Sequence, residues 1–378
     1  MGSTPVKQGT VPDNQSAASG PLRGIRVLEF AGLGPVPYAA MLLSDMGADV
    51  LRIDRPGTHR RPHDIVGRGR TSCELDLKDE RDLEHVMYLS SQADVLLEGF
   101  RPGVMERLGL GPEPLLQKNP RLVYGRMTGW GQSGPLADKA GHDINYIALT
   151  GALSCIGQAD GPPAVPLNLI GDYGGGSMFL AVGVLSALIE AGKSGRGQVV
   201  DCAICDGVTS LMSLFHSLTA AEAWHSRGTN QFDGGAHFYS TYECADGEYI
   251  AIGAGESKFY AAFRQVLGLS DPVFDDQRNR SNWPDLKQRV ATVIKTRTRD
   301  DWMSRFEDWD ACASPVLSIS ESLLHPHIQA RNSVLEHQGI MQSAPAPRFS
   351  RTRSMIQEGR DLGSKQEIYA CWPARESH

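Results

Sequence analysis

Short apolar runs that alternate with helical patterns constrain the fold of this chain more than any other feature. The run Ile25–Phe30 predicts a strand, Tyr38–Met46 carries apolar residues at helical spacing, and Ala48–Ile53 predicts a second strand. The alternation continues with a helical pattern at 80–91 and strand patterns at 93–97 and 121–128. Strands that alternate with helices are typical of a parallel sheet covered by helices. The sequence therefore predicts an α/β fold with a Rossmann-like, parallel-sheet domain.

The second half of the chain predicts two apolar helices and then a smaller α+β domain. The helices span Met178–Ile189 and Asp206–Trp224, the first preceded by a glycine-rich turn at 171–177. Strands at 239–243 and 249–253 flank Ala245-Asp246-Gly247 as a hairpin, and helices follow at 259–267 and 283–295. We therefore expect a tail at 1–20, a large domain from 21–224 and 316–378, a linker at 225–236 and a small domain at 237–315.

Composition excludes several classes of function. The 378 residues carry 37 Lys plus Arg against 44 Asp plus Glu, and this net charge of -7 argues against a general nucleic-acid or membrane-surface binder. No apolar run approaches a membrane span, and the polar N-terminus predicts a disordered tail rather than a signal sequence. Seven scattered cysteines favour a reducing compartment. We expect a cytoplasmic protein, with peroxisomal or mitochondrial import left open.

Glycines after the first predicted strand raise a dinucleotide-binding alternative. Gly32 and Gly34 follow that strand, and Asp54 ends the next one, as in a Rossmann fingerprint. The third glycine of the fingerprint is missing, however, and Pro35 and Pro37 occupy the loop. We interpret this segment as a turn that leads into a helix.

Cations and glycines follow the ends of two predicted strands. Arg55 comes directly after one strand, Gly99, Phe100 and Arg101 follow another, and Arg107 lies shortly beyond. Open α/β sheets bind ligands at the carboxyl ends of their strands, where a guanidinium suits phosphate and glycine lets backbone N–H groups approach it. A set of solvated surface arginines is the alternative.

Three ionisable residues stand out as candidates for catalysis. His142 and Asp143 lie at the start of a predicted helix, where Asp143 is a plausible cap and unpaired backbone N–H groups can hold an oxyanion. Asp172 lies in the glycine-rich turn, and Glu256 follows a strand of the small domain. A core histidine, a helix N-cap and a solvated loop acid are the respective alternatives. Neither the Cys202/Cys205 pair nor His325 and His327 predict a metal site.

At these residues the sequence resembles the alpha-methylacyl-CoA racemases of the class III CoA-transferase (CaiB/BaiF) family. The resemblance covers nearly all of 21–349, and the stretches that carry it are Gly24–Glu29, Ala48–Pro56, Arg101–Gly103, Glu106–Pro112, Gly141–Tyr146 and Gly171–Met178. It implies a large domain built from both chain ends, a smaller domain, and a homodimer whose two subunits are interlocked like chain links.

The resemblance also implies roles for individual residues. His142 and Asp172 match the proton-transfer residues of the racemases, and Glu256 matches an acid that supports the histidine from the partner subunit. The positions that match CoA contacts are Arg55, Leu75, Asp76, Leu77, Lys78, Gly99, Phe100, Arg101, Arg107, Gly141, His142, Asp143, Ile144, Asn145 and Tyr146.

These residues suit the inversion of a carbon beside a thioester. The α-hydrogen of a thioester is acidic because the enolate spreads its charge onto oxygen, and inversion requires one base on each face of that carbon. His142 and Asp172 would be the two bases, and backbone N–H at Asp143 would stabilise the enolate oxygen by roughly 3 kcal/mol per donor. This chemistry requires no metal and no cofactor beyond the CoA of the substrate, so we expect neither.

Two other functions remain open from the sequence. A CoA-transferase would use Asp172 as a nucleophile, although its family pattern lacks Gly141–Tyr146 and has glycines where this chain has Glu256. A non-catalytic CoA-binding protein is the other alternative. The acyl group is also open between 2-methylacyl chains and amino-acid or peptide groups of the isopenicillin type. Lys258 beside Glu256 motivates a hypothesis that the acyl group is polar.

Overall fold

The computed structural model describes residues 19–58 and 63–375. The predicted tail at 1–20 lies outside the described residues except for Ser19 and Gly20, which pack against Met46 and Gly47.

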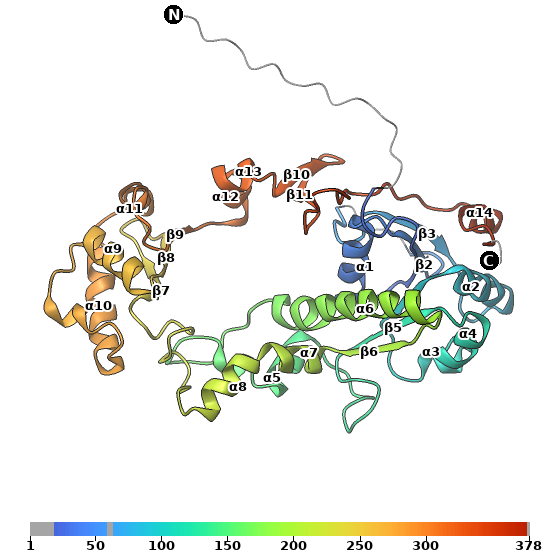
Figure 1. Ribbon diagram of the computed structural model, residues 1–378, viewed down its shortest axis with the longest axis horizontal. Helices are drawn as coiled ribbons and strands as arrows, with labels where there is room; N and C mark the ends of the chain where they lie inside the picture. Colours follow the sequence, from blue (N-terminus) through green and yellow to red (C-terminus); the bar gives the residue numbers. More distant parts are fainter. Residues whose placement is uncertain (1–18, 59–62, 376–378) are drawn as a thin grey trace, which may run out of the picture.

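A six-stranded sheet, parallel throughout, forms the centre of the large domain, so the predicted α/β fold with a Rossmann-like sheet is confirmed (Figure 1). Its spatial order is β3-β2-β1-β4-β5-β6. The strands are β1 (Arg26–Phe30), β2 (Asp49–Asp54), β3 (Arg70–Glu74), β4 (Val95–Glu98), β5 (Val123–Thr128) and β6 (Val199–Ala203). This order reverses direction between β1 and β4, and the carboxyl ends of all six strands lie along one edge.

Helices cover both faces of this sheet, and alternate residues of the buried strands point into two apolar cores. One core joins Val27, Val95 and Val123 to helices α1 (Pro35–Asp45), α5 (Asp143–Leu149), α6 (Phe179–Ser194) and α7 (Ile204–Leu211). The other joins Leu28, Leu96 and Tyr124 to α2 (Glu80–Gln92), α3 (Val104–Arg107), α4 (Pro112–Lys118) and α14 (Lys365–Cys371). The short helix η1 (Leu153–Cys155) follows α5.

The structure corrects three sequence predictions. Strand β3 was not predicted, because its sequence Arg-Thr-Ser-Cys-Glu has no apolar run. The single helix predicted at 206–224 is two helices, α7 and α8 (Ser213–Ala220), which meet at Met212. The glycine-rich segment is not a turn but a π-helix, η2 (Leu169–Met178), that continues directly into α6.

The continuous helix Leu169–Ser194 is long and apolar enough to cross a membrane by length and composition alone. A core helix of a globular domain passes the same test, and 44% of the most apolar window is buried. Its contacts with β5 and β6 identify it as a helix of the sheet domain.

The smaller unit has its own apolar core, built from residues 236–313. The predicted hairpin is confirmed as β7 (Tyr239–Glu243) paired antiparallel with β8 (Tyr249–Gly253), and β9 (Ala313–Val316) adds a third strand. The helices of this unit are α9 (Ser257–Leu267), η3 (Pro272–Asp275), η4 (Arg280–Asn282), α10 (Trp283–Ile294) and α11 (Arg299–Phe306).

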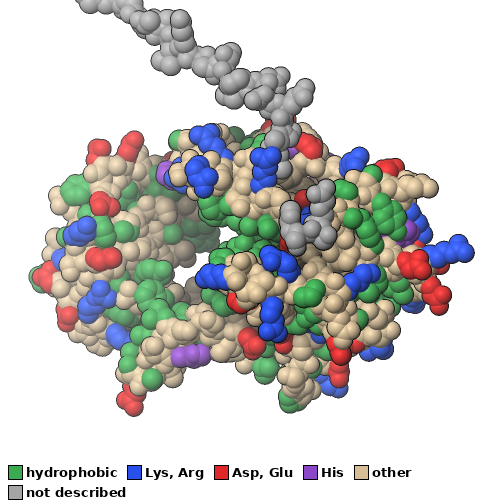
Figure 2. Space-filling model, turned by 45° about the vertical axis from the view of Figure 1, so that its right-hand side comes forward, with side chains coloured by type: hydrophobic (Ala, Val, Ile, Leu, Met, Phe, Trp, Pro, Cys, Tyr) green, Lys and Arg blue, Asp and Glu red, His purple; other side chains and the backbone are tan. Residues whose placement is uncertain are grey.

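Two separate connections join the two units into a ring. One runs from α8 to β7, and Arg227 in this segment donates to the carbonyls of Gln158 and Gly161 in the loop after η1. The other contains α12 (Ile319–Leu324), α13 (Pro326–Ala330) and the hairpin β10 (Val334–His337) with β11 (Ile340–Ser343). Figures 1 and 2 show that these connections enclose an opening through the molecule.

The C-terminal segment returns to the large domain and closes its second core. Trp372 is fully buried there, and its Nε1 donates to Asp49 Oδ2 at 2.7 Å. Tyr88 Oη donates to the Trp372 carbonyl at 2.8 Å. The sheet domain is therefore completed by residues from both ends of the chain.

Replacing Trp372 tests how much this return stabilises the sheet domain. We expect Trp372→Ala to lower the free energy of unfolding by about 3–5 kcal/mol, since it leaves a large cavity. Trp372→Phe keeps most of the packing and should cost about 1–2 kcal/mol for the lost hydrogen bond. Trp309→Ala is the control, because Trp309 is 40% exposed. Urea unfolding followed by circular dichroism measures all three, and similar losses for Trp372→Ala and Trp309→Ala would contradict this account.

Candidate active site

A long cavity of about 610 Å³ opens at the carboxyl ends of β1, β2 and β3. The predicted ligand positions that line it are Arg55, Leu75, Asp76, Leu77, Lys78, Phe100 and Arg107. Its apolar wall includes Phe30, Leu33 and Ile53. Three cations, Arg55, Lys78 and Arg107, therefore outnumber the two carboxylates of Asp54 and Asp76 in a largely apolar cavity, although the chain carries a net negative charge. Such a site suits a ligand with an anionic group and a flat or extended apolar part.

Two smaller cavities lie next to the long one along the same edge of the sheet. One of about 250 Å³ shares Phe100 with it and is lined by Gly99, Arg101 and Gly141. The other, of about 230 Å³, shares Leu33 with the long cavity and contains both His142 and Asp172. Gly99 lines both small cavities, and a Cβ there would lie 3.0 Å from Val36 Cγ2, so a side chain would crowd this passage. The three cavities are therefore neighbours that share walls.

His142 caps the helix that carries it. It is the N-cap of α5 with extended backbone angles, and its backbone N–H donates to Asn145 Oδ1 at 3.1 Å. The prediction that Asp143 caps this helix is wrong by one residue, because the Asp143 carboxylate points to another segment. The His142 side chain is exposed in the single chain. The cap therefore fixes the backbone of His142 while its imidazole stays accessible to the cavity.

Asp172 owes its position to the glycines of η2. A Cβ at Gly175 would lie 2.8 Å from the backbone nitrogen of Val208, and one at Gly207 would lie 1.9 Å from the Gly175 carbonyl oxygen. Only glycine at both positions lets η2 and α7 touch backbone to backbone. A Cβ at Gly176 would lie 3.0 Å from Pro35 Cβ, at the start of α1, and 3.2 Å from Ile204 Cγ1 on α7. The π-helical turn is thus held between α7 and the start of α1.

The start of α1 supplies the surface that faces the Asp172 carboxylate. Gly34 has φ of 73°, and a Cβ there would lie 3.2 Å from Asp172 Oδ2. Ser177 Oγ donates to the carbonyls of Pro35, at 2.7 Å, and Asp172, at 3.0 Å. The segment that we interpreted as a turn leading into a helix is such a turn, and it also forms a wall of the site.

The Asp143 carboxylate links the two candidate bases. Its Oδ2 accepts the backbone N–H of Asp172 at 2.6 Å. A Cβ at Gly171 would lie 2.2 Å from the same oxygen, so glycine is required beside it. Asp143 Oδ1 is buried and accepts no hydrogen bond from the residues that the structure describes. Asp143 therefore holds the chain at Asp172 from the first residue of α5.

Burial and charge raise the proton affinity of this cluster. Burial raises the pKa of Asp172, the neighbouring Asp143 raises it further, and Asn168 and His142 oppose the shift. Burial likewise raises the pKa of Asp143, against the nearby backbone N–H groups of Asp172 and Gly171. Carboxylates with raised pKa values in a cavity are candidates for proton transfer.

The structure does not bring all predicted residues to these cavities. Glu256 is an exposed N-cap of α9 in the small unit and lines none of the three. Ile144 is 40% exposed and Asn145 serves the cap, so neither lines a cavity. Tyr146 lines both small cavities, and its hydroxyl donates to the Gly141 carbonyl.

Sequence reasoning missed the loop after β5. Thr128, Gly129 and Trp130 line the small cavities, and a Cβ at Gly129 would lie 2.0 Å from the Tyr146 ring. The sequence could have indicated this loop, because it follows the strand predicted at 121–128 just as Gly99 to Arg101 follow the strand predicted at 93–97. The carboxyl ends of neighbouring parallel strands meet at one edge.

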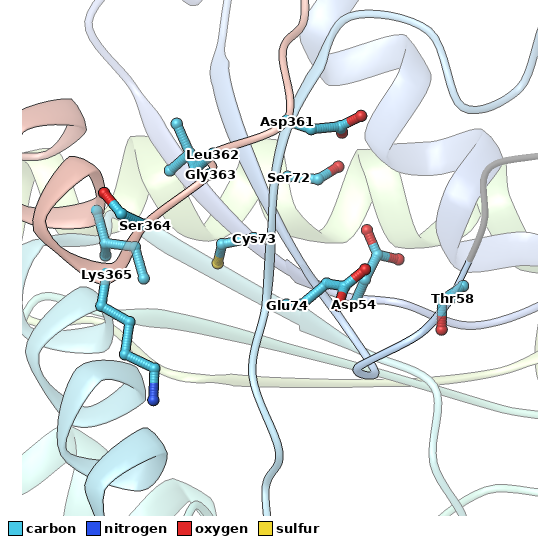
Figure 3. Close-up of a pocket in the computed structure, with 11 residues that line it drawn as sticks. Asp54, Thr58, Ser72, Cys73, Glu74, Asp361, Leu362, Gly363, Ser364 and Lys365 are labelled. Carbon is cyan, nitrogen blue, oxygen red and sulfur yellow. The ribbon is translucent and has the colours of Figure 1, made fainter.

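A further cavity of about 390 Å³ lies beside the long one and shares Asp54 and Thr58 with it (Figure 3). Strand β3 and the returning segment 361–368 line it, and Glu74 and Asp361 add carboxylates. Lys365 also lines it, but its ammonium group pairs with Asp82. This cavity therefore presents mostly negative charge and does not suit the anionic end of a ligand.

Comparison with known proteins places these features in one family. Residues 22–360 match CoA-transferase family III. The chain is 44% identical to the alpha-methylacyl-CoA racemase of Mus musculus over 342 residues, which cover 90% of this chain and 89% of that protein. It is 43% identical to the racemase of Homo sapiens over 345 residues, with the same shares. The acetyl-CoA:oxalate CoA-transferase of Acetobacter aceti is 30% identical, over 85% of this chain and 87% of that protein.

Solved structures agree with the fold. A CaiB/BaiF family protein from Brucella suis is 25% identical with a TM-score of 0.78, over 93% of this chain and 98% of that one. Rv3272 from Mycobacterium tuberculosis is 26% identical with a TM-score of 0.77, over 93% and 99%.

Substituting Gly207 tests the contact that positions Asp172. The Cβ of Gly207→Ala would overlap the Gly175 carbonyl, so we expect a loss of about 1–3 kcal/mol in the free energy of unfolding and a displaced η2. Gly192→Ala in α6 is the matched control, because nothing lies within 4 Å of a Cβ there and alanine favours helix. Chemical denaturation and a crystal structure of the variant measure both effects. An unmoved Asp172 in a Gly207→Ala protein of normal stability would contradict the packing argument.

Proposed function

Because the chain belongs to CoA-transferase family III, we propose that it is an isomerase, an acyl-CoA racemase or epimerase that inverts the α-carbon of a 2-substituted acyl-CoA. The observation that carries the proposal is that His142 and Asp172 line one cavity from two different elements, next to a cation-lined cavity. Relatives named as racemases, at 43–44% identity over about nine-tenths of both chains, support it.

The proposed reaction moves one proton between two bases. For one enantiomer, His142 removes the α-hydrogen, and protonated Asp172 returns a hydrogen to the other face. For the mirror image the roles are exchanged, so each side chain is the base in one direction and the acid in the other. The negative charge of the enolate develops on the thioester oxygen, and the backbone N–H of Asp143 at the start of α5 is the proposed donor to it. The pair of bases ends each turnover with one proton, as it began.

The cavities suggest how the CoA part is held. Arg55, Lys78 and Arg107 would bind phosphates in the long cavity, and Leu75 and Phe100 would supply apolar contact. Arg101 and Gly141 line the passage from there toward His142. An extended chain running from the long cavity to the small one would place its thioester between the two bases.

The ring shape supports the proposed interlocked homodimer. The single chain encloses an opening (Figure 2), and one side of each ring would pass through the opening of the other. Large exposed apolar side chains fall on the elements η2, α6 and α7–α8, among them Leu169, Val182, Ile189, Leu211 and Leu214. Exposed apolar surface of this extent is typical of a face that a second subunit covers. Glu256, which lies away from His142 in its own chain, would reach the His142 of the other subunit.

The acyl group is proposed only as 2-substituted. A 2-methylacyl chain and an amino-acid-derived group both remain candidates, and the polar hypothesis rests on Lys258, whose Nζ lies 4.3 Å from the Phe259 ring centroid. We propose the cytoplasm as the compartment, because seven scattered cysteines favour a reducing environment. Turnover of a panel of acyl-CoAs distinguishes the acyl groups, and equal rates for plain and polar groups would remove the basis of the polar hypothesis.

Solvent deuterium tests the reaction. Incubated in heavy water with one acyl-CoA and no second acid, the wild type should invert the α-carbon and incorporate deuterium there. His142→Ala and Asp172→Asn should each lose inversion by about 10²–10⁴-fold, since each lacks one general acid–base group. Asp172→Asn should still exchange the hydrogen of the single enantiomer that faces His142. Mass spectrometry reports deuterium and chiral chromatography reports inversion.

The same assay separates the rival reactions. A CoA-transferase would show no α-deuterium, would require an acceptor acid, and would form an acyl anhydride at Asp172. A CoA-binding protein without catalysis would leave every acyl-CoA unchanged. Either outcome across the panel would contradict the proposed racemase.

Subunit complementation tests the shared site. We expect His142→Ala and Glu256→Ala homodimers each to be impaired. In a mixed dimer, the site that combines the intact His142 of one chain with the intact Glu256 of the other should recover about half of the activity per dimer. The two variants are co-expressed with different tags, because interlocked chains do not exchange. Mixed dimers no more active than either homodimer would contradict action across the interface.

A further inference from the structure

We propose that the Asp143 carboxylate is the positioning residue of this site: it holds Asp172 in place through one backbone hydrogen bond and keeps a negative charge beside it. This inference rests on the proposed racemase reaction and goes beyond the role that we assign to the backbone N–H of Asp143. The side chain, not the N–H group, is the subject here.

The geometry supports a dedicated contact rather than a surface charge. Asp143 is 8% exposed, and its Oδ2 lies 2.6 Å from the backbone nitrogen of Asp172, 29 residues further along the chain. Gly171 leaves the space that this carboxylate fills. Oδ1 is buried without a partner among the described residues. A buried carboxylate oxygen without a hydrogen-bond partner lowers the stability of the fold, so its presence beside a candidate catalytic residue calls for an explanation.

The surroundings leave Asp143 as the main negative neighbour of Asp172. His142 and Tyr146 face Asp172 from α5, and Asn168 hydrogen-bonds it from the residue before η2. Burial raises the pKa of Tyr146, Arg101, which follows β4, opposes this shift, and Cys205 on α7 adds to it. From α1, Tyr38 stacks on Tyr173 with ring centroids 4.3 Å apart. Of these groups Asp143 raises the pKa of Asp172, whereas Asn168 and His142 lower it.

A two-base racemase needs such a neighbour. The enzyme must carry its proton on the Asp172 carboxyl group to convert one enantiomer and on the His142 imidazole to convert the other. Unperturbed His and Asp differ by about 2.6 pKa units, which makes the two placements differ about 400-fold in population. A negative charge beside the carboxylate strengthens its hold on the proton and narrows this difference. This effect requires that the Asp143 carboxylate stays ionised while Asp172 carries the proton, which we expect because Asp172 lines the cavity and Asp143 does not.

Asp143→Asn removes the negative charge beside Asp172 but keeps the hydrogen bond that positions it, because the asparagine oxygen can still accept the Asp172 backbone N–H. In the active form the pair of bases carries one proton, so the acid limb of kcat/KM against pH reports protonation of the Asp172 carboxylate. Removing the adjacent charge makes that carboxylate harder to protonate, so this limb should move to lower pH. We expect kcat/KM to fall about tenfold, equally in both directions, because their ratio is fixed by the equilibrium between the two epimers.

Two further variants keep the test decisive. Asp143→Ala removes the hydrogen bond as well, and we expect a fall of about 100-fold or more in kcat, as for a misplacement of about 1 Å. Gly171→Ala keeps the carboxylates of Asp143 and Asp172 but displaces that of Asp143. We therefore expect kcat to fall while the acid limb of the pH profile moves little. Asp79→Asn is the matched control, since Asp79 also accepts backbone N–H bonds, at the N-cap of α2, and asparagine caps equally well. Its pH profile should match the wild type.

The outcomes are distinguishable from failure of the proposed function. Wild type that places no deuterium on any acyl-CoA overturns the racemase itself. If the wild type exchanges its α-hydrogen for deuterium as expected while the folded Asp143→Asn variant keeps the wild-type acid limb of kcat/KM against pH, that pair of results overturns only the role of Asp143. Should Asp143→Asn not fold, Gly171→Ala decides, because wild-type kcat in that variant also overturns the positioning role.

Discussion

The backbone contact between η2 and α7 is the constraint on which the rest of this structure depends. Gly175 and Gly207 allow two helices to approach until one carbonyl oxygen occupies the space of a side chain. The same segment packs against α1 and continues into α6. Helix α1 packs on β1, β2 and β4, and α6 packs on β5 and β6, so both belong to the first core of the sheet. Asp172 therefore lies on a turn fixed from several sides, and the cavity that it shares with His142 follows from helix packing rather than from a mobile loop.

The long cavity is lined by cations although the chain as a whole carries a net negative charge. Buried ion pairs link strands of the sheet: Arg70 on β3 pairs with Glu29 on β1, both fully buried, and near the carboxyl ends Arg126 on β5 pairs with Glu98 on β4. A buried charge is tolerated when it is paired in this way, whereas removal of one partner is strongly destabilising. The cations that line the long cavity stand on this rigid edge. A net negative protein can thus present a positive pocket to an anionic substrate while its outer surface repels other anions.

The sequence predicted those features that depend on local pattern. The hairpin at 239–243 and 249–253 was predicted to the residue because its turn chemistry and its alternation agree. Strand β3 was missed because Arg70 is buried by an ion pair and not by an apolar side chain. The break at Met212 carries no glycine or proline to mark it. The Asp143 carboxylate binds a backbone group 29 residues away, and Glu256 serves another subunit in the proposal, so neither relation can be read from spacing. Tertiary contact decided these cases, and the resemblance to a family supplied the roles that pattern could not.

The central claim is that an imidazole and a carboxylate approach one carbon from opposite faces. The most direct measurement is a crystal structure of the dimer with a 2-substituted acyl-CoA or a planar mimic of its enolate. The account predicts a His142 ring nitrogen and an Asp172 carboxylate oxygen each about 3–3.5 Å from the α-carbon, on opposite sides of the thioester plane. A ligand with both side chains on the same side of that plane, or with either one out of reach, would contradict it.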